Sequence, residues 1–306
     1  MIRSQDITQQ RQQEAAVALG FFDGVHLGHR AVIGAAIEEG RKRGLASRVF
    51  TFDPAGDKPA SKNALTLLQT EEQKDRVLEA MGADEVVCPP FSSFKNLSPE
   101  DFFHHLLMDT LRARVLTCGE NYRFGHFAAA GVDQLREMCC QAGVQLVVVP
   151  PVTLDGEMIS STRIRQALRD GDVELANRML GAPFTLEAPV VHGKQWGRTV
   201  SCPTINQLFP EGFTVPRYGV YAAEVMVDGR RYRGVTNIGI KPTMQDNYLT
   251  CETYLLDFSG DLYEKTVGVS LIHFLRPETR FSSAAELSEQ IHKDIRQVEQ
   301  ALPAGC

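Results

Sequence analysis

Residues 15–33 read "AAVALGFFDGVHLGHRAVI" and join a short apolar run to an amphipathic segment through a loop of glycines and histidines. The first six residues are typical of a buried β-strand. From about His29, apolar residues recur at the spacing of one helix face (Ile33, Ala36 and Ile37). The stretch therefore predicts a strand, a loop and a helix in succession, which is the building unit of an α/β sheet.

The chain up to about residue 180 repeats this alternation. Further strands are expected at 47–52, 84–88, 113–119 and 144–149, and helices at 70–82, 98–111 and within 132–142. Thr70 and Gln73 form a capping-box pattern, and Ser98 followed by proline is typical of a helix start. Apolar strands that alternate with helices predict a parallel sheet covered by helices on both faces.

The pattern changes near residue 183. Strand-like segments follow one another at 184–191, 219–227, 230–238, 249–258 and 265–275, and Asp228-Gly229 is typical of a tight hairpin turn. A final helix begins at a capping-box pattern of Ser283 and Glu286 and carries an apolar stripe (Leu287, Ile291, Ile295 and Val298). These features predict two domains, 1–183 and 184–306, of which the second is a small antiparallel β-barrel with a C-terminal helix.

Composition limits the class of protein. The 306 residues are 43% hydrophobic and 23% charged, and a net charge of −6 argues against a general nucleic-acid surface. The first sixteen residues are polar, and no apolar run approaches the length of a membrane helix, so we expect neither a signal peptide nor a membrane partner. Seven cysteines without a CxxC pair favour neither disulfides nor a zinc site, and we expect a reduced, cytoplasmic protein.

The loop after the first strand lies where ligands bind in open α/β sheets. Free amides at a helix start favour phosphate, and glycines let its oxygens approach the backbone. The imidazoles of His26 and His29 can donate hydrogen bonds to a phosphoryl group. A metal site is less favoured, because the helical HExxH pattern is absent, and ordinary turn residues are the remaining interpretation. The chain contains neither a GxGxxG loop nor a P-loop.

"GFFDGVHLGH" resembles the HxGH signature of nucleotidylyltransferases, in the longer form found in the bacterial bifunctional riboflavin kinase/FAD synthetase family. Three more segments resemble that family: "TLLQTEEQKDRVLEAMGADEV" (66–86), "CGENYRFG" (118–125) and "ISSTRIRQAL" (159–168). The resemblance implies a Rossmann-like FMN adenylyltransferase domain that transfers the adenylyl group of ATP to FMN and yields FAD and pyrophosphate.

The resemblance also implies the residues of that site. His26 and His29 would be catalytic, and the ATP phosphates would be held by both histidines together with Gly20, Phe22, Gly24, Ser161, Thr162, Arg163 and Arg165. Arginine suits this role because its planar fork matches phosphate oxygens. Asn121 and Asp53 would bind the flavin, and the carbonyl of Asn121 would contact flavin phosphate or Mg²⁺. Ala55 stands where relatives commonly have a histidine near the flavin.

The second half contains "HGKQWGRTVSCPTIN" (192–206), in which a glycine-rich turn precedes a Pro-Thr-x-Asn sequence that resembles the PTAN motif of riboflavin kinases. The resemblance implies that Mg²⁺–ATP is held by Gly193, Lys194, Gly197, Thr204 and Asn206, with Thr204 and Asn206 as metal ligands. Glu252, in "CETYLL", takes the family's catalytic-base position. A base helps because the primary hydroxyl of riboflavin is a poor nucleophile at neutral pH.

These observations favour an enzyme that phosphorylates riboflavin to FMN and adenylylates FMN to FAD, with ATP and Mg²⁺ at two sites. They are compatible with an oligomer but do not require one. Departures from the family at Ala55 and at Ser201-Cys202 leave open an enzyme with one remaining activity. Glu264, where relatives have a glycine, is a smaller departure at an expected turn. Two further alternatives are a flavin-binding regulatory protein and another HxGH adenylyltransferase, such as one acting on a pantetheine phosphate, although the latter leaves the second half unexplained.

Overall fold

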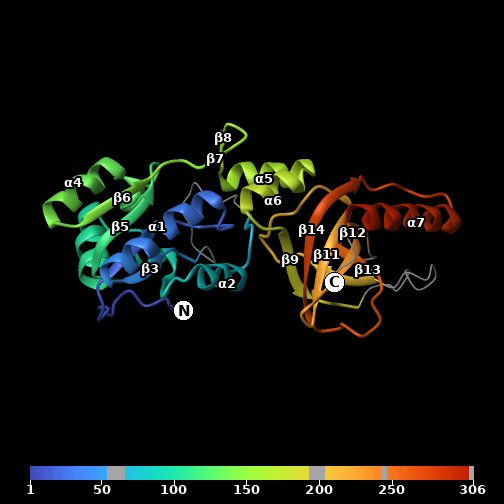
Figure 1. Cartoon of the computed structure of the whole chain (residues 1–306), viewed down its shortest axis with the longest axis horizontal. Helices are drawn as coiled ribbons and strands as arrows, with labels where there is room; N and C mark the ends of the chain where they lie inside the picture. The colour runs from blue at the N-terminus through green and yellow to red at the C-terminus, as the bar shows by residue number, and fades with distance from the viewer. Residues whose placement is uncertain (54–65, 193–203, 243–246, 303–306) are drawn as a thin grey trace. The chain divides into compact units, whose positions relative to one another are not determined.

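The computed structural model describes residues 1–53, 66–192, 204–242 and 247–302. The chain forms two compact units (Figure 1). Unit 1 comprises Met1–Leu65 and Thr70–Ser160, and unit 2 comprises Thr66–Gln69 and Ser161–Cys306.

Unit 1 is built on a six-stranded parallel sheet with the order β1-β4-β3-β2-β5-β6. Its strands are β1 (Ile2–Ser4), β2 (Ala15–Leu19), β3 (Ala46–Phe50), β4 (Glu85–Val87), β5 (Ala113–Gly119) and β6 (Gln145–Val149). The predicted parallel sheet is confirmed, whereas β1 was not predicted because it has only three residues. After β2, the chain adds β3 and β4 on one side of it and β5 and β6 on the other, so the strand order reverses between β2 and β5. In α/β sheets, ligands bind at the carboxyl ends of the strands at such a reversal point.

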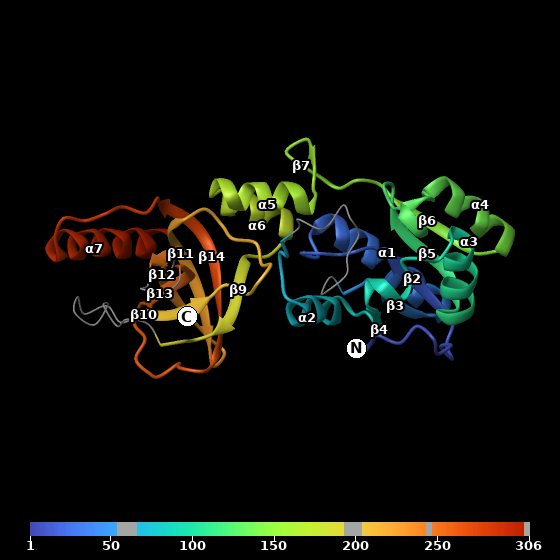
Figure 2. The ribbon, with the colours of Figure 1, turned by 180° about the vertical axis from the view of Figure 1, so that it is seen from behind.

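Helices cover both faces of this sheet (Figure 2). Residues of α1 (Leu27–Arg43) and α2 (Glu71–Met81) share a core with Ala16 and Ala18 of β2. On the opposite face, Val17 and Leu19 pack with the helix that begins as α3 (Pro99–Asp101) and continues as the π-helical η3 (Phe102–Thr110), and with α4 (Val132–Ala142). The sides alternate because successive strand residues point to opposite faces.

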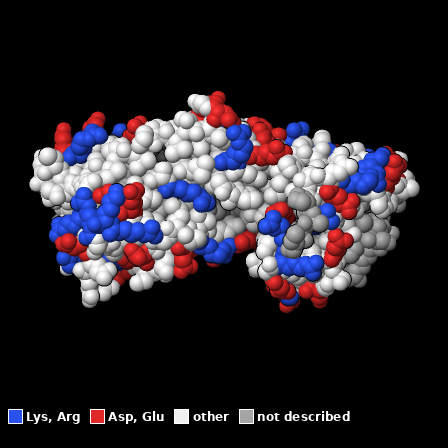
Figure 3. Space-filling model, viewed as in Figure 1, with Lys and Arg blue, Asp and Glu red and all other residues white. Residues whose placement is uncertain are grey.

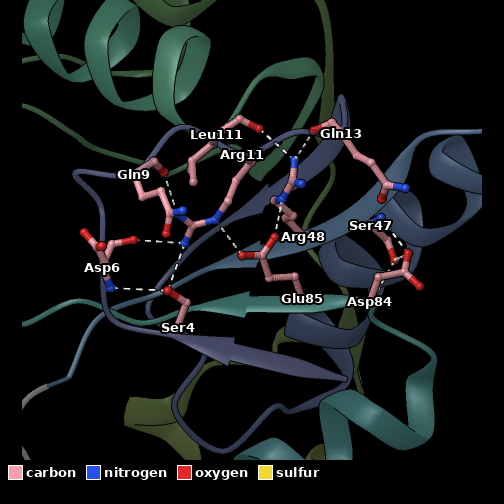
Figure 4. A network of polar contacts seen from close by, with 10 residues as sticks. All are labelled: Ser4, Asp6, Gln9, Arg11, Gln13, Ser47, Arg48, Asp84, Glu85 and Leu111. Carbon is pink, nitrogen blue, oxygen red and sulfur yellow. Dashed lines mark hydrogen bonds and ion pairs between the residues drawn. The ribbon is translucent and has the colours of Figure 1, made fainter.

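An ionic network closes the amino-terminal edge of the sheet (Figure 4). The buried carboxylate of Glu85, at the start of β4, accepts hydrogen bonds from Arg48 and from Arg11, the latter at 2.7 Å. Arg48 also donates to the carbonyl oxygens of Gln13 and Leu111, at 2.9 and 2.8 Å, just before β2 and β5. Arg48, in β3, therefore links the beginnings of β2, β4 and β5. This edge of the sheet is opposite the predicted site.

Unit 2 contains a six-stranded antiparallel sheet with the order β10-β13-β12-β11-β14-β9. Its strands are β9 (Phe184–Pro189), β10 (Thr204–Leu208), β11 (Gly219–Val227), β12 (Arg230–Pro242), β13 (Asn247–Leu255) and β14 (Thr266–Arg276). The amide of Val191 donates to the carbonyl of Asn206 at 2.8 Å, so the chain after β9 meets β10 and curls the sheet toward a barrel. The predicted antiparallel fold is confirmed.

The hairpin and the terminal helix of unit 2 follow from local sequence. Asp228 and Gly229 have positive φ values of 50° and 78°, as the predicted tight turn requires. Helix α7 (Ala284–Ala301) begins at Ser283, whose hydroxyl accepts the amide hydrogen of Glu286. The capping box is only half formed, because the Glu286 carboxylate accepts hydrogen bonds from Ser282 rather than from the Ser283 amide. The stripe residues Ile295 and Val298 pack in the core as predicted.

Helices α5 (Ser161–Asp170) and α6 (Val173–Leu180) belong to unit 2 by their contacts. The side-chain amide of Asn177 in α6 donates to the carbonyl of Leu271 in β14 at 2.8 Å. The two units therefore divide between Ser160 and Ser161, before the change of sequence pattern at 183/184. The domain boundary at 183/184 stays a prediction. The remaining short elements are η2 (Phe91–Ser93), η4 (His126–Ala128), β7 (Thr153–Leu154) and β8 (Glu157–Met158).

Three general expectations can be compared with the described residues. None of their helices combines the length and the apolar character needed to cross a membrane. The described cysteines are all free thiols, and burial raises the pKa of Cys251 to about 12. On the face shown in Figure 3, Lys and Arg side chains lie beside Asp and Glu side chains.

Candidate active sites

The loop after β2 is a strained turn anchored in the core. Phe22, Gly24 and Val25 have positive φ values of 53°, 84° and 34°. Such a conformation costs a non-glycine residue about 1–3 kcal/mol and persists only where the surroundings impose it. Here Phe22 and Val25 are buried in the core beneath α1, which supplies that constraint. Gly20 is required because a Cβ at this position would lie 2.7 Å from the Phe22 ring.

This turn places His26 at the N-cap of α1. Its Nδ1 accepts the amide hydrogen of His29 at 3.3 Å, and the two imidazole rings stack with centroids 3.6 Å apart. Because Nδ1 accepts a hydrogen bond, a neutral His26 carries its proton on Nε2, where it can donate to a ligand. Gly28 makes this stacking possible, since a Cβ there would lie 3.1 Å from Cε1 of His26.

The start of α1 is electrostatically suited to an anion. The helix is 17 residues long, and its first turn contains no acidic residue. The amides of the first turn and the helix dipole therefore present positive potential beside the paired imidazoles. These features together make the turn a phosphate-binding candidate.

The two predicted flavin residues lie at the same edge of the sheet. Asp53 follows β3, where its amide donates to the carbonyl of Pro89 at 3.1 Å, and Asn121 follows β5 with an exposed side chain. The loops after β2 and β3 are tied together by the Thr51 hydroxyl, which donates to the Phe21 carbonyl at 2.8 Å. The structure thus gathers His26, His29, Asp53 and Asn121 at one carboxyl edge, whereas Ala55 lies outside the described residues.

The predicted segment at residues 161–165 forms the first half of α5, in unit 2. Arg165 is buried, and its Nε donates to the carbonyl of Thr66 at 2.6 Å, which ties the 66–69 segment to α5. Arg163 and Ser161 are half-buried and Thr162 is exposed. Arg165 therefore has a structural contact that the sequence did not indicate.

A second polar site lies on one face of the antiparallel sheet. Thr204 and Asn206 are two residues apart on β10, and Asn206 is directly opposite Glu252 of β13. All three side chains consequently lie on the same face. The side-chain nitrogen of Asn206 donates to the Thr204 carbonyl at 3.4 Å, so its Oδ1 is the atom available to a cation.

The donor chemistry of this face fits Mg²⁺. A hydroxyl, an amide oxygen and a carboxylate are hard oxygen donors, and magnesium usually takes one or two protein ligands while substrate phosphates and waters supply the rest. The described residues contain no group of three or more histidine, cysteine or acidic side chains that could hold a metal ion. The predicted Gly193, Lys194 and Gly197 lie outside the described residues, as do Ser201 and Cys202.

Two polar residues near Glu252 were not predicted from the sequence, Asn237 and Glu278. Asn237 of β12 lies directly opposite Glu252, on the side away from Asn206. Its Nδ2 donates to Oε1 of Glu278 at 3.4 Å, and Gly239 leaves the space beside it that the Glu278 carboxylate fills. The sequence signal for Asn237 was a polar residue in the strand-like run 230–238. Its place beside Glu252 depends on the register between β12 and β13. Glu264 occupies a turn with φ of 64°, which confirms the predicted turn.

Comparison with protein families assigns both halves of the chain. The FAD synthetase model matches residues 8–163, and the riboflavin kinase model matches residues 180–302. A bifunctional riboflavin kinase/FMN adenylyltransferase from Listeria monocytogenes is 34% identical over 91% of this chain and 89% of its own length. The protein of that name from Escherichia coli K12 is 37% identical over 94% and 93%.

A similar solved structure covers the whole fold. A crystal structure named as a macrolide-efflux protein from Streptococcus pneumoniae superposes with a TM-score of 0.88 at 29% identity, over 97% of this chain and 98% of its own.

Both family models match, so the second half is explained as a riboflavin kinase domain and the alternative of another HxGH adenylyltransferase is wrong. The protein is a transferase that phosphorylates riboflavin with ATP to FMN and adenylylates FMN with ATP to FAD and pyrophosphate. The chain belongs to the bifunctional riboflavin kinase/FMN adenylyltransferase family.

Proposed function

We propose that the two activities use two separate sets of residues. FMN adenylylation takes place at the carboxyl edge of the unit 1 sheet, and riboflavin phosphorylation takes place on the face of β10 and β13 that carries Glu252. The change of sequence pattern and the ranges of the two family models support domains at 1–183 and 184–306. Contacts nevertheless group α5 and α6 with the second unit.

For adenylylation, the site must bring the FMN phosphate in line with the α-phosphorus of ATP. A phosphate oxygen of FMN forms the new P–O bond as the bond to pyrophosphate breaks. His26 and His29 donate hydrogen bonds to the ATP phosphates, where negative charge accumulates on the leaving group. The cap geometry of His26 supports this role, because Nδ1 accepts the His29 amide hydrogen and the proton of the neutral ring is therefore on Nε2.

The other predicted residues of this reaction keep their proposed roles. Gly20, Phe22 and Gly24 shape the turn, and Ser161, Thr162, Arg163 and Arg165 bind ATP phosphate. Asn121 and Asp53 contact the flavin, and their position at the same sheet edge as His26 supports this.

For phosphorylation, the Glu252 carboxylate takes the proton of the riboflavin 5′-hydroxyl as that oxygen attacks the γ-phosphorus of ATP, and ADP leaves. Thr204 and Asn206 hold Mg²⁺, which neutralises phosphate charge when bound. The single observation that carries this proposal is the register that sets Asn206 opposite Glu252. Gly193, Lys194 and Gly197 cover the phosphates, a role supported by sequence alone. The use of ATP as a substrate supports a cytoplasmic location for this enzyme.

The magnesium role is tested by replacing Thr204 and titrating Mg²⁺ in the riboflavin phosphorylation assay. Thr204→Val keeps the shape but loses the hydroxyl, so the Mg²⁺ concentration for half-maximal rate should rise about tenfold or more. Thr204→Ser keeps the hydroxyl and is the matched control, with a near-normal Mg²⁺ requirement. An unchanged requirement in Thr204→Val would remove Thr204 from the metal site.

A further inference from the structure

Arg30, near the start of α1, holds the backbone on both sides of His26. Its amide donates to the His26 carbonyl at 2.9 Å, and its side-chain Nε donates to the Val25 carbonyl at 3.0 Å. These carbonyls belong to the peptide groups that follow and precede the Cα of His26. Because peptide groups are planar, holding both carbonyls restricts rotation about the backbone bonds of His26, whose φ and ψ are −65° and 171°.

Only the second of these hydrogen bonds depends on the arginine side chain. The amide bond to His26 is an ordinary helical bond that any residue except proline makes. The bond to Val25 needs a donor on a long side chain, and Arg30 reaches back to this carbonyl because helical side chains point toward the N-terminus. Val25 has a strained φ of 34°, so its peptide group is one that the surroundings must hold.

The positive charge of Arg30 is not explained by the stability of the helix. A cation in the first turn of a helix is unfavourable beside the positive end of the dipole. The first turn of α1 contains no acidic residue, and no described carboxylate forms an ion pair with Arg30. Within the described part of the chain, the contact that this side chain makes is therefore the one with the turn.

The His26 ring is sensitive to the direction of its backbone. Its Nδ1 accepts the His29 amide hydrogen at 3.3 Å, slightly beyond the usual range of about 2.7–3.2 Å, and the two rings stack with centroids 3.6 Å apart. A rotation of the His26 backbone would lengthen this hydrogen bond further and change the direction of the Nε2 proton. A support for the Val25–His26 peptide group thus acts on the position of the imidazole.

We propose that Arg30 is a positioning residue for FMN adenylylation, which acts through the hydrogen bond from its Nε to the Val25 carbonyl. The proposal rests on the proposed role of His26 and His29 as donors to the ATP phosphates. By holding the peptide group before His26, Arg30 keeps the imidazole aligned for the moment when charge accumulates on the leaving pyrophosphate. Its contribution is the directed donor rather than the charge.

The test compares Arg30→Met with Arg30→Gln in FAD formation from supplied FMN. Both side chains are uncharged, but the glutamine amide nitrogen lies as many bonds from Cα as Nε of arginine, whereas methionine has no donor. Arg30→Met should lower kcat about tenfold, with the KM for FMN changed less than about twofold. Arg30→Gln should restore kcat to within about twofold of the unmodified enzyme, and riboflavin phosphorylation should be unchanged in both.

Two other results would overturn the proposal. An equal loss in both variants would assign the effect to the charge, and full activity in both would leave Arg30 without a role. Circular dichroism establishes that each variant is folded, and rates are given per folded enzyme. Should Arg30→Met be unfolded, Arg30→Ala takes its place with the same expectation.

A double variant distinguishes positioning from a general structural role. If Arg30 acts through His26, Arg30→Met should change kcat less than about twofold when His26 is already replaced by alanine, because coupled residues are not additive. A structural role would give the same tenfold loss in both backgrounds, and this result would contradict the proposal.

Arg41→Met is the matched control, with the same substitution in the same helix. Arg41 is exposed in the last turn of α1, eleven residues or about 16 Å along the helix from Arg30. It should keep the rates of both reactions.

His26→Ala separates failure of this proposal from failure of the proposed function. If His26→Ala lowers FAD formation about a hundredfold while Arg30→Met retains the rate, the positioning role is wrong and the histidine role stands. If His26→Ala itself retains the rate, the histidine role is wrong and the positioning role with it.

Discussion

His26 and His29 meet within the first turn of one helix, whereas Asn206 and Glu252 meet across the ladder of two strands that are far apart in the sequence. The first pair is positioned by a loop of unusual backbone conformation, in which Gly28 leaves room for the His26 ring. The second pair is positioned by regular backbone hydrogen bonds between β10 and β13. The same protein thus builds one of the two proposed sites locally and the other by strand register.

Because the two sites are built differently, different substitutions are expected to disturb them. A site made by one turn depends on small residues and on φ values that most residues avoid, so a single added methyl group can disturb it. A site made by register tolerates changes of backbone preference but loses its geometry if a strand shifts by one residue, because every side chain then changes face.

The largest effect is expected for Glu252→Gln. Removing the proposed base should lower riboflavin phosphorylation about a hundredfold or more, and FAD formation from supplied FMN should continue. Separation of the flavins by chromatography measures both reactions. Glu224→Gln on β11 is the control, since β12 separates β11 from β13 and Glu224 forms an ion pair with Arg231 at a distance from the site. Loss of both activities in Glu252→Gln would contradict two separate sites.

His29→Ala is expected to have a comparable effect on the other reaction. FAD formation should fall about a hundredfold, because a donor to the ATP phosphates is lost, and FMN formation should be retained. His105→Ala changes an exposed histidine of the same unit and should leave both rates unaltered. The two-site account fails if FMN formation falls as far as FAD formation in His29→Ala.

A smaller effect separates the two ways of building a site. A Cβ at Gly28 would press on the His26 ring, so Gly28→Ala should lower FAD formation about tenfold, since small displacements of positioning groups are costly in catalysis. Gly34→Ala in the same helix meets open space. It should keep the rate and raise the free energy of unfolding by about 0.5–1 kcal/mol. Equal rates of FAD formation in Gly28→Ala and Gly34→Ala would mean that the turn at Gly28 is not under steric constraint.

The smallest effect on activity is expected at the opposite edge of the sheet. The backbone amide and hydroxyl of Ser47 donate to Asp84 at 2.8 and 2.7 Å, and the backbone hydrogen bond lowers the pKa of Asp84 (Figure 4). Asp84→Asn should therefore cost about 1–2 kcal/mol of stability at pH 7 without changing either rate.

The pH dependence of this loss follows from the direction of the shift. A carboxylate with a lowered pKa stabilises the fold above its unfolded pKa of about 4, and this contribution disappears as pH falls through the folded value. Urea unfolding should thus show that the difference in free energy of unfolding between Asp84→Asn and the unmodified enzyme becomes smaller at acid pH. A free-energy difference that stays constant with pH would exclude the ionised carboxylate as its cause.

The local site could be predicted from sequence because all its signals lie within one stretch. The apolar run of β2, the glycines and the two histidines together indicated a phosphate loop before the helix. Elements with complete local signals, such as α2 with its Thr70 and Gln73 cap, were also predicted. The strain at Phe22 and Val25 could not be, because it follows from burial of these side chains in the core.

The register site was predicted only in part. Thr204, Asn206 and Glu252 were identified through resemblance to a family, whereas their common face follows from the pairing of β10 with β13. Asn237 carried no signal of its own, since a polar residue on a strand is ordinary until its cross-strand partner is known. The association of α5 with the second unit likewise depends on a long-range contact, in which the Arg217 amide donates to the Leu168 carbonyl at 2.8 Å.

The central claim is that two separate sites act in sequence, and a mixing experiment with His29→Ala and Glu252→Gln tests it most directly. Each variant is supplied with riboflavin, ATP and Mg²⁺ and the flavins are separated with time. His29→Ala alone should stop at FMN, Glu252→Gln alone should leave riboflavin unchanged, and the mixture should form FAD because FMN released by one variant is used by the other. A mixture that forms no FAD, or a single variant that has lost both reactions, would contradict the account.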